Sequence, residues 1–288
     1  MVIVAALLGM PTTVVPAFAN APSAAGTAPL AGATLTAPHA ASETLPSSSG
    51  VLSHERTFTT WAHPLQEVSI HQDPTASSRV IGRTHLATED GVPEVYLLLS
   101  SLTDARGRMW VRVRIPGRPN GRVGWLPREA LGEFRLTNWL LEISLGSRRL
   151  RAYYKGRLRF TAPVGVGKPS TPTPAGRFWI REIFRLSDRS NPYWPYAIGT
   201  SAYSTLTDWP GGGVVGIHGD FGEPQLVPGD PSHGCVRMHA RDLAWLAPRV
   251  QIGTPVHIIP YAGAHDWLRV CPRALAVTPS EHLDRAYS

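Results

Sequence analysis

The chain has 288 residues, which is enough for two domains that each bury a hydrophobic core. Its 28 Lys and Arg residues exceed the 21 Asp and Glu residues and give a formal net charge of +7. After position 19, no apolar run approaches the roughly 20 residues that a bilayer-spanning helix needs, which excludes a later membrane span.

The opening residues, 1–19, have the pattern of a signal peptide. They are apolar from Val2 to Leu8 and close with Ala-Phe-Ala at positions 17–19, a small-x-small pattern that suits cleavage before Asn20. No Lys or Arg precedes the apolar run, so either the signal is atypical or the true start lies further upstream. A retained anchor is disfavoured because prolines interrupt a run that is already short. We expect export to the periplasm or cell wall, with no stable membrane span.

Residues 20–56 are predicted to be a linker rich in Ala, Pro, Ser and Thr, because such a stretch buries too little apolar surface to fold. Residues 1–50 hold no Lys or Arg and one acid, so the remainder carries 28 positive and 20 negative charges, or +8. Lys155 and Lys168 are the only lysines. An arginine-rich surface suits nucleic acid, anionic polymers or lipid headgroups. In an exported protein we expect anionic cell-wall polymers and no nucleic acid, with general solubility as the alternative role.

Residues 57–132 predict a small β-barrel. Alternating apolar and polar residues from Trp110 to Ile115 have the period of a half-buried strand, and Trp110 and Trp125 are expected in the core. Turn residues separate five short strands at 68–70, 79–82, 95–99, 109–113 and 121–126. The order Val-Ile-Gly, Gly-x-x-Trp-Val-x-Val and Gly-Trp-Leu resembles a bacterial SH3-like domain. The resemblance implies a domain that binds peptidoglycan or positions a catalytic domain, and a simple packing partner is the alternative.

Residues 138–260 predict a second, mainly β domain with one or two short helices. Strands are expected at 139–144, 149–154, 158–162, 178–184 and 253–259, and helical spacing is found at 240–250. Four prolines and three glycines between 163 and 178 predict an ordered loop. Residues 187–213 are rich in aromatic side chains and are expected to form a long loop that lines the site, with Tyr203 and Trp209 as substrate-binding candidates. The tail, 261–288, has no predicted role.

The stretch 217–238, IHGDFGEPQLVPGDPSHGCVRM, is where we expect the chemistry. Cys235 becomes a nucleophile as a thiolate, and a neighbouring imidazole that accepts its proton generates one near neutral pH. His233 shares a face with Cys235 if the backbone is extended, but not if the chain turns at Gly234. His218 follows an apolar run typical of a strand and is the better base, because it need not share the turn of the sulfur.

Gly234 leaves no side chain beside the sulfur, so a substrate carbonyl has room to approach. We expect the backbone amides of Gly234 and Cys235 to donate to the oxyanion that develops as the sulfur attacks.

The pairing of IHG with SHGCVRM resembles the active-site signature of the L,D-transpeptidase catalytic domain (YkuD). The loop at 163–178 resembles a second motif of that family, Val-x-x-Gly-Lys-x-x-x-Thr-Pro-x-Gly-x-Phe. By position, the resemblance implies that Cys235 is the nucleophile, that His218 is the base, and that the Gly219 carbonyl orients the imidazole. It also implies that Ser232, His233 and Gly234 shape the site and that Arg237 contacts substrate. The 13-residue spacer between His218 and Ser232 is at or below the short end of the family range.

Other interpretations of the cysteine remain. A lone Cys is often a small buried apolar group. A zinc site with ligands from His218, His233, Cys235 and His239 is a further alternative, although a second closely spaced ligand pair is missing from the sequence. Cys271 invites a disulfide with Cys235 in an exported chain, but that bond would block the nucleophile, so both thiols are predicted to be free.

The resemblance implies acyl transfer on peptidoglycan stem peptides, with loss of the terminal D-alanine and cross-linking between third positions, and it requires no metal or organic cofactor. Water as the acceptor would make the protein an L,D-carboxypeptidase or amide hydrolase. A papain-like protease is disfavoured because there the Cys precedes the His, and a non-catalytic wall-binding protein is the alternative from another class.

Overall fold

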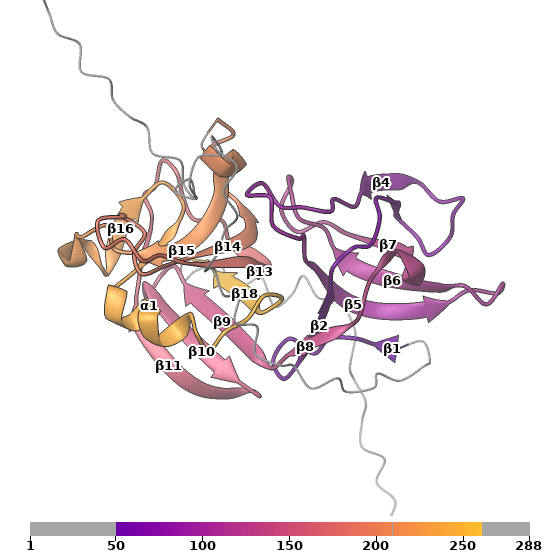
Figure 1. Cartoon of the computed structure of the whole chain (residues 1–288), viewed down its shortest axis with the longest axis horizontal. Coiled ribbons are helices and arrows are strands. Elements are labelled where there is room, and N and C mark those ends of the chain that lie inside the picture. The colour runs from indigo at the N-terminus through magenta and orange to yellow at the C-terminus, as the bar shows by residue number, and fades with distance from the viewer. Residues whose placement is uncertain (1–49, 209, 261–288) are drawn as a thin grey trace, which may run out of the picture.

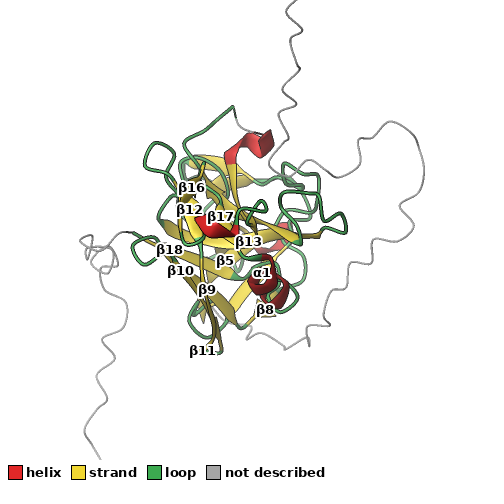
Figure 2. Ribbon diagram, turned by 90° about the vertical axis from the view of Figure 1, so that its left-hand side faces the viewer, coloured by secondary structure: helices red, strands yellow, loops and turns green. Residues whose placement is uncertain are grey.

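The computed structural model describes residues 50–208 and 210–260. The predicted signal peptide, most of the predicted linker, Trp209 and the tail with Cys271 lie outside the described residues. Figure 1 shows two β-rich bodies side by side, the first carrying β1 to β8 and the second carrying the later strands. Figure 2 shows that strands far outnumber helices. The prediction of a mainly β fold is confirmed.

The first body is one eight-stranded antiparallel sheet with the order β4-β3-β7-β6-β5-β2-β8, and β1 also pairs with β5. Its elements are β1 (Gly50–Val51), β2 (Thr59–Ala62), β3 (Ser69–His71), β4 (Val80–Arg83), β5 (Tyr96–Thr103), β6 (Met109–Arg114), β7 (Val123–Pro127), the short 3-10 helix η1 (Arg128–Ala130) and β8 (Arg135–Thr137).

The alternation of apolar and polar residues predicted for β6 determines which of its side chains this sheet buries. Val111 and Val113 pack into a core with Tyr96 and Leu98 of β5, whereas Arg112 between the two valines is exposed. Trp110 is buried, as predicted, whereas Trp125, which was also predicted in the core, is only half-buried. The strands therefore follow the sequence pattern closely, while the SH3-like barrel itself stays a prediction.

The second body is a ten-stranded sheet with the order β11-β10-β9-β18-β13-β14-β15-β17-β12-β16. Its elements are β9 (Trp139–Ser144), β10 (Arg149–Tyr154), β11 (Arg157–Pro163), β12 (Gly165–Gly167), β13 (Gly176–Arg185), β14 (Tyr196–Tyr203), η2 (Pro210–Gly213), β15 (Val214–Gly219), η3 (Pro224–Leu226), β16 (Gly229–Ser232), β17 (Val236–Met238), α1 (Ala240–Leu246) and β18 (Pro255–Ile259).

The core of the second body joins its strands to its one α-helix. Leu243 and Leu246 on α1 belong to the same buried cluster as Phe178 on β13, Ile217 on β15 and Met238 on β17. Among the described residues, no helix has the length and hydropathy to cross a membrane. The core thus holds β15 and β17, which carry the sequence motifs, against α1 and β13.

The prediction of one long aromatic loop from 187 to 213 is wrong. Residues Tyr196–Tyr203 form β14, which pairs with β13 on one side and β15 on the other and is buried along nearly its whole length. Small residues such as Gly199 and Ala202 let this strand lie flat in the middle of the sheet, and the pattern of aromatic residues gave no indication of it. The segments 187–195 and 204–208 on either side of β14 are loops, and 210–213 form η2.

The two bodies contact each other through an apolar cluster of Trp61, Val95 and Leu97 from the first sheet and Trp179 from β13. The indole Nε1 of Trp179 donates to the carbonyl of Val95 at 2.8 Å. Buried apolar surface and a satisfied indole N–H both stabilise the contact.

Candidate active site

Two parallel neighbouring strands, β15 and β17, bring His218 and Cys235 together. His218 lies opposite Arg237 in the register, and one pair earlier Ile217 lies opposite Val236, the residue after the cysteine. The backbone N–H of Gly216 points at Cys235 Sγ, with 3.4 Å between nitrogen and sulfur. Gly216 and His218 share a face of β15 because side chains alternate along a strand. The pairing brings the two residues to the same end of β17, although 17 positions separate them in the sequence.

His218 is held as a neutral imidazole. Its Nδ1 lies 2.8 Å from the carbonyl oxygen of Gly219, and because a carbonyl only accepts, the proton is on Nδ1 and Nε2 keeps its lone pair. Burial lowers the pKa of His218 to about 3, and the nearby charge of Arg237 acts in the same direction. The ring is ready to accept a proton at Nε2.

Cys235 is held as a thiol. Burial raises its pKa above the ordinary value, and the Gly216 N–H and the charge of Arg237 offset only part of that effect. A thiol in this state would have to lose its proton as it attacked a substrate. The site thus resembles a hydroxyl nucleophile with a base more than a preformed thiolate.

The turn before Cys235 is fixed by side-chain hydrogen bonds. Ser232 Oγ donates to the Cys235 carbonyl at 2.6 Å and accepts from the Gly234 N–H at 3.1 Å. Thr173 Oγ1 donates to the Gly234 carbonyl at 2.8 Å, which ties the Pro-rich loop to the turn. Gly234 has a φ of 128°, a backbone conformation that side chains rarely adopt.

The same bonds correct the predicted oxyanion site. The Gly234 N–H is already bonded to Ser232, so of the two predicted donors only the Cys235 N–H stays a candidate. Ser232 acts by shaping the turn, as the resemblance implied for its position.

His233 lies away from the sulfur, because the chain turns at Gly234. The imidazole is exposed, and its Nε2 lies 2.9 Å from Lys168 Nζ. Of the two backbone conformations that the sequence left open, the structure has the turn at Gly234, so His233 and Cys235 do not share a strand face. His239 in turn contacts Asp220 at 3.3 Å. The four-ligand zinc alternative is not assembled, and no group of three or more metal-binding side chains occurs within residues 50–208 and 210–260.

Aromatic rings surround the imidazole. The Tyr193 ring lies edge-on to His218 with 4.6 Å between centroids, and the Phe221 ring lies at 5.2 Å. Burial raises the pKa of Tyr193, and the negative charge of a Cys235 thiolate adds to the rise, so the phenol lies near the sulfur. The sequence indicated an aromatic region here but could not single out Tyr193.

Arg237 closes the site from β17. Its guanidinium carbon lies 4.3 Å from the centroid of Phe221, and Nη1 donates to Glu223 Oε2 at 2.8 Å. These contacts place a positive charge beside the imidazole and the sulfur, which is consistent with the substrate-contacting role that the resemblance implied.

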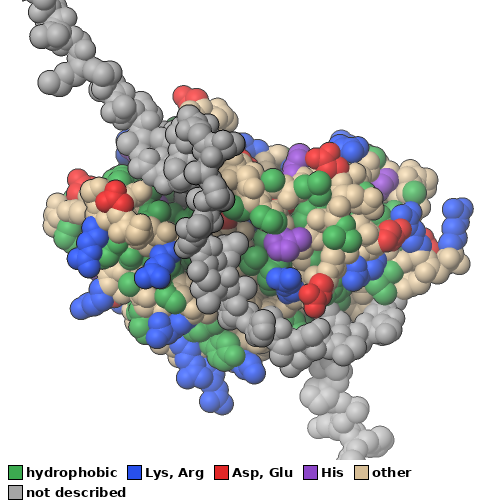
Figure 3. All heavy atoms as spheres, in the orientation of Figure 1, with side chains coloured by type: hydrophobic (Ala, Val, Ile, Leu, Met, Phe, Trp, Pro, Cys, Tyr) green, Lys and Arg blue, Asp and Glu red, His purple; other side chains and the backbone are tan. Residues whose placement is uncertain are grey.

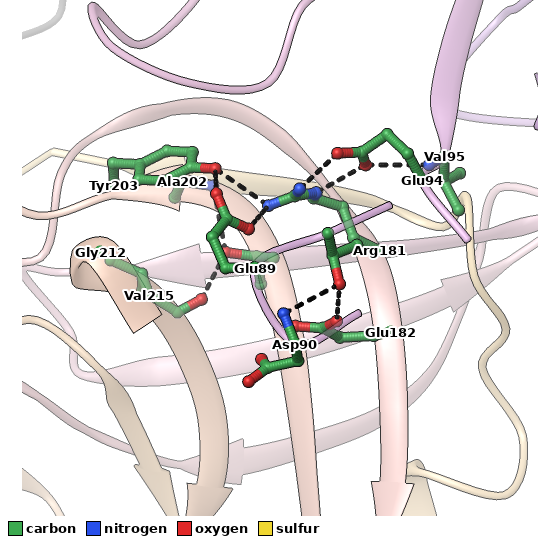
Figure 4. Close-up of polar contacts among 12 residues, drawn as sticks. Glu89, Asp90, Glu94, Val95, Arg181, Glu182, Ala202, Tyr203, Gly212 and Val215 are labelled. Carbon is green, nitrogen blue, oxygen red and sulfur yellow. Dashed lines mark hydrogen bonds and ion pairs between the residues drawn. The ribbon is translucent and has the colours of Figure 1, made fainter. Parts of the chain in front are cut away.

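Tyr203 lies elsewhere. It is buried, and its hydroxyl contacts Glu89 and accepts a hydrogen bond from Arg181 Nη1 at 3.0 Å (Figure 4). Through these partners, the Tyr203 phenol belongs to the contact between the two sheets. The other predicted substrate-binding residue, Trp209, lies outside the described residues.

The first sheet supports the turn indirectly, which the sequence did not predict. The side chain of Ser204 packs against Gly234, where a Cβ atom would lie 3.0 Å from the Ser204 Cβ. Arg118, from the loop between β6 and β7, donates to the Ser204 carbonyl at 2.9 Å, and Asn120 donates to the Tyr203 carbonyl at 2.8 Å. The segment after β14 is thus held from both sides.

Residues 138–258 match the family model of the L,D-transpeptidase catalytic domain, YkuD. A protein of Bacillus licheniformis named as the L,D-transpeptidase YkuD is 37% identical over 120 residues, which is 42% of this chain and 65% of the relative. The corresponding protein of Bacillus subtilis is 33% identical, over 41% of this chain and 64% of the relative. The chain thus spans less than two thirds of the length of these curated relatives.

A longer match covers both bodies. L,D-transpeptidase 1 of Mycobacterium tuberculosis is 24% identical over 68% of this chain and 87% of its own length. A crystal structure of an L,D-transpeptidase from the same organism is 14% identical over 68% of this chain and 97% of that chain, with a TM-score of 0.38. The family match over residues 138–258 and the Bacillus relatives confirm the resemblance found in the sequence motifs.

Proposed function

We propose that the protein is a peptidoglycan L,D-transpeptidase with Cys235 as its nucleophile. The observation that carries the proposal is the pairing of β15 with β17, which sets the sulfur at the Gly216 N–H and beside an imidazole whose Nε2 is left to accept a proton. The catalytic domain spans residues 138–260, and residues 57–132 are an SH3-like domain that positions it or binds the wall.

In the first step, His218 Nε2 takes the thiol proton while Cys235 Sγ attacks the carbonyl that joins the third stem residue to the terminal D-alanine. The oxyanion of the tetrahedral intermediate accepts a hydrogen bond from the Cys235 N–H. The imidazolium then protonates the departing D-alanine nitrogen, and a thioester remains. No charge separation persists before substrate binds, because both groups are neutral at rest.

In the second step, an amine from another stem attacks the thioester carbon and loses a proton to His218 Nε2. The tetrahedral intermediate collapses, the thiolate takes back its proton, and a new amide joins two stems at their third positions. The same site with water as the acceptor would act as an L,D-carboxypeptidase or amide hydrolase.

Anionic cell-wall polymers are a proposed second partner. Lys and Arg side chains gather at the lower left of Figure 3, where Figure 1 places β10 and β11. Arg149, Arg157 and Arg159 are exposed there on an edge of the ten-stranded sheet. A surface of one charge attracts a polyanion over a distance of about 10 Å at moderate salt. Export to the periplasm or cell wall follows from this function.

The test is incubation of the protein and its Cys235→Ala variant with disaccharide-tetrapeptide, followed by mass analysis of the products. Loss of D-alanine with formation of a dimer, only with the native cysteine, is the expected result. Loss of D-alanine without a dimer would indicate the carboxypeptidase. No cysteine-dependent product, together with no labelling of Cys235 by a thiol probe, would overturn the proposal.

A further inference from the structure

A hairpin of the first sheet reaches onto the second sheet. This docking hairpin, residues 86–94, connects β4 to β5 and is closed by the Thr88 N–H, which donates to the Val92 carbonyl at 2.8 Å. It contacts β13 through the side chains of Thr88, Glu89, Asp90 and Glu94, and Figure 4 shows Glu89 and Glu94 facing Arg181.

A β-bulge explains why two consecutive residues of β13 both face the hairpin. Ile180 pairs with Thr200, but Glu182 pairs with Gly199, so Arg181 is an extra residue on this strand. Side chains normally alternate between faces, and a bulge breaks that alternation. Arg181 and Glu182 therefore point the same way.

The charge of Arg181 is paired with carboxylates of the protein itself. Its Nε donates to Glu94 Oε1 at 2.7 Å, a second guanidinium nitrogen contacts the other oxygen of Glu94, and Nη1 donates to Glu89 at 2.9 Å. Arg181 and Glu94 are both almost completely buried. This is a bidentate, charge-assisted pair of the kind that fixes two elements together.

Glu182 is not satisfied in the same way. The residue is 3% exposed, and Thr88 Oγ1 donates to its Oε2 at 2.8 Å. Its Oε1 is buried and accepts no hydrogen bond from an N–H or hydroxyl group of the described residues, and the Glu182 carboxyl interacts instead with the carboxyl of Asp90. Asp90 lies on the exposed tip of the hairpin. Burial and that carboxylate raise the pKa of Glu182 to about 8, so at neutral pH the two acids hold one proton between them.

Glu182 Oε1 lies over β14, the strand that separates β13 from β15. Glu182 pairs with Gly199 and Gly199 pairs with Gly216, so the three residues form one row across β13, β14 and β15. A Cβ atom on Gly199 would lie 2.2 Å from Glu182 Oε1, so the carboxyl reaches over β14 towards β15. Neighbouring strands are about 4.8 Å apart, and the row ends at the N–H that contacts the sulfur.

A bound ammonium group has what this place lacks. It carries three N–H donors and a positive charge, which together satisfy a buried acceptor and replace the shared proton. A metal ion is disfavoured, because the part of the chain that the structure describes holds no cluster of three metal-binding side chains. A stem peptide with a diamino acid at its third position carries such an amine a few bonds from the carbonyl that Cys235 attacks.

We propose that Asp90 and Glu182 form a subsite that binds the side-chain ammonium group of the donor stem. The inference rests on the proposed function for its substrate, and it assigns the first sheet a direct part in substrate recognition through the docking hairpin. Asp90 supplies the exposed charge that meets the amine, and Glu182 supplies the buried acceptor over Gly199.

The test is calorimetric binding of two ligands to the Cys235→Ala variant, which cannot turn them over. The ligands are disaccharide-tetrapeptide with a free side-chain amine and the same compound with that amine acetylated. We expect the free amine to bind roughly tenfold tighter, as one charge-assisted interaction implies. Added Asp90→Asn or Glu182→Gln should remove this preference, and Glu67→Gln, at an exposed acid of the first sheet, should leave it unchanged.

Equal binding of the two ligands would overturn the subsite, as would equal losses for both ligands in Asp90→Asn. Asp90 is exposed, so this variant decides the matter even if Glu182→Gln does not fold. The outcomes separate the two proposals. A persistent amine preference without any cysteine-dependent product would refute the transpeptidase, whereas cysteine-dependent product with no amine preference would refute only the subsite.

Discussion

Arg181 and His218 are each 2% exposed, yet the protein holds them in opposite charge states. Burial disfavours the charged form of both side chains. For Arg181, carboxylates of Glu94 and Glu89 outweigh burial and raise its pKa. His218 has a carbonyl partner and the positive charge of Arg237 nearby, and its pKa falls to about 3.

The comparison teaches that partners, not burial, decide what a buried base does. Arg181 is a fixed charge that fastens the docking hairpin to β13. His218 is an uncharged acceptor, free to gain a proton only when chemistry supplies one. The same degree of burial thus serves attachment in one region and proton transfer in the other.

The largest expected effect comes from removing the proton acceptor. His218→Gln should lower kcat/KM for D-alanine release by about 10²–10⁴-fold, because the thiol then has no base. His85→Gln, at an exposed histidine of the first sheet, is the matched control and should change the rate little. A His218 variant within tenfold of the native rate would show that another group takes the proton.

The second effect concerns the partner of Arg181. Glu94→Ala leaves a buried guanidinium with part of its charge uncompensated, and we expect a loss of about 3–5 kcal/mol in the free energy of unfolding. Glu129→Ala breaks an ion pair that is about half exposed and should cost about 0–1 kcal/mol. Urea denaturation measures both, and equal losses would refute the contrast between the two ion pairs.

The third effect is a pH dependence of stability that follows from the raised pKa of Glu182. Its pKa is raised from 4.5 to about 8, so the folded protein holds the proton more tightly than the unfolded chain does. That contribution is present below pH 4.5 and is lost as the pH rises towards 8. Stability should therefore fall by roughly 1–3 kcal/mol across this window, and less in Glu182→Gln. Identical pH dependence in the two proteins would contradict the shift.

The smallest expected effect is that of pH on kcat/KM in the neutral range. With the pKa of His218 near 3 and that of Cys235 above its ordinary value, the resting pair keeps one protonation state through the neutral range. We expect kcat/KM for a donor whose side-chain amine is acetylated to vary less than about tenfold between pH 5 and pH 8. A steep rise through pH 6 to 7 would indicate that His218 titrates there and that burial does not control it.

Much of the fold could be predicted because strand alternation is local. The pattern from Trp110 to Ile115 predicts β6, and the apolar run before His218 predicts β15. β14 was missed because its small residues carry little apolar signal, although its neighbours bury it. The pairing of β14 with β13 and with β15 joins residues that are far apart in the sequence, so no short segment predicts it.

The site divides in the same way. Motif spacing predicted that Cys235 and His218 would meet, but the turn at Gly234 depends on hydrogen bonds from Ser232 and from Thr173 in another loop. The choice between Tyr193 and Tyr203 depends on which strand end each phenol faces. Arg181 and its partners, 87 positions apart for Glu94, gave no sequence signal at all.

The docking hairpin limits how this protein can be recombined. A shorter chain that begins near residue 138 would expose Trp179 and leave Arg181 without Glu94 and Glu89. A chimera with a different N-terminal half would need to supply an equivalent acidic hairpin. The two halves are thus expected to tolerate engineering only as a single unit, even though each has its own sheet and core.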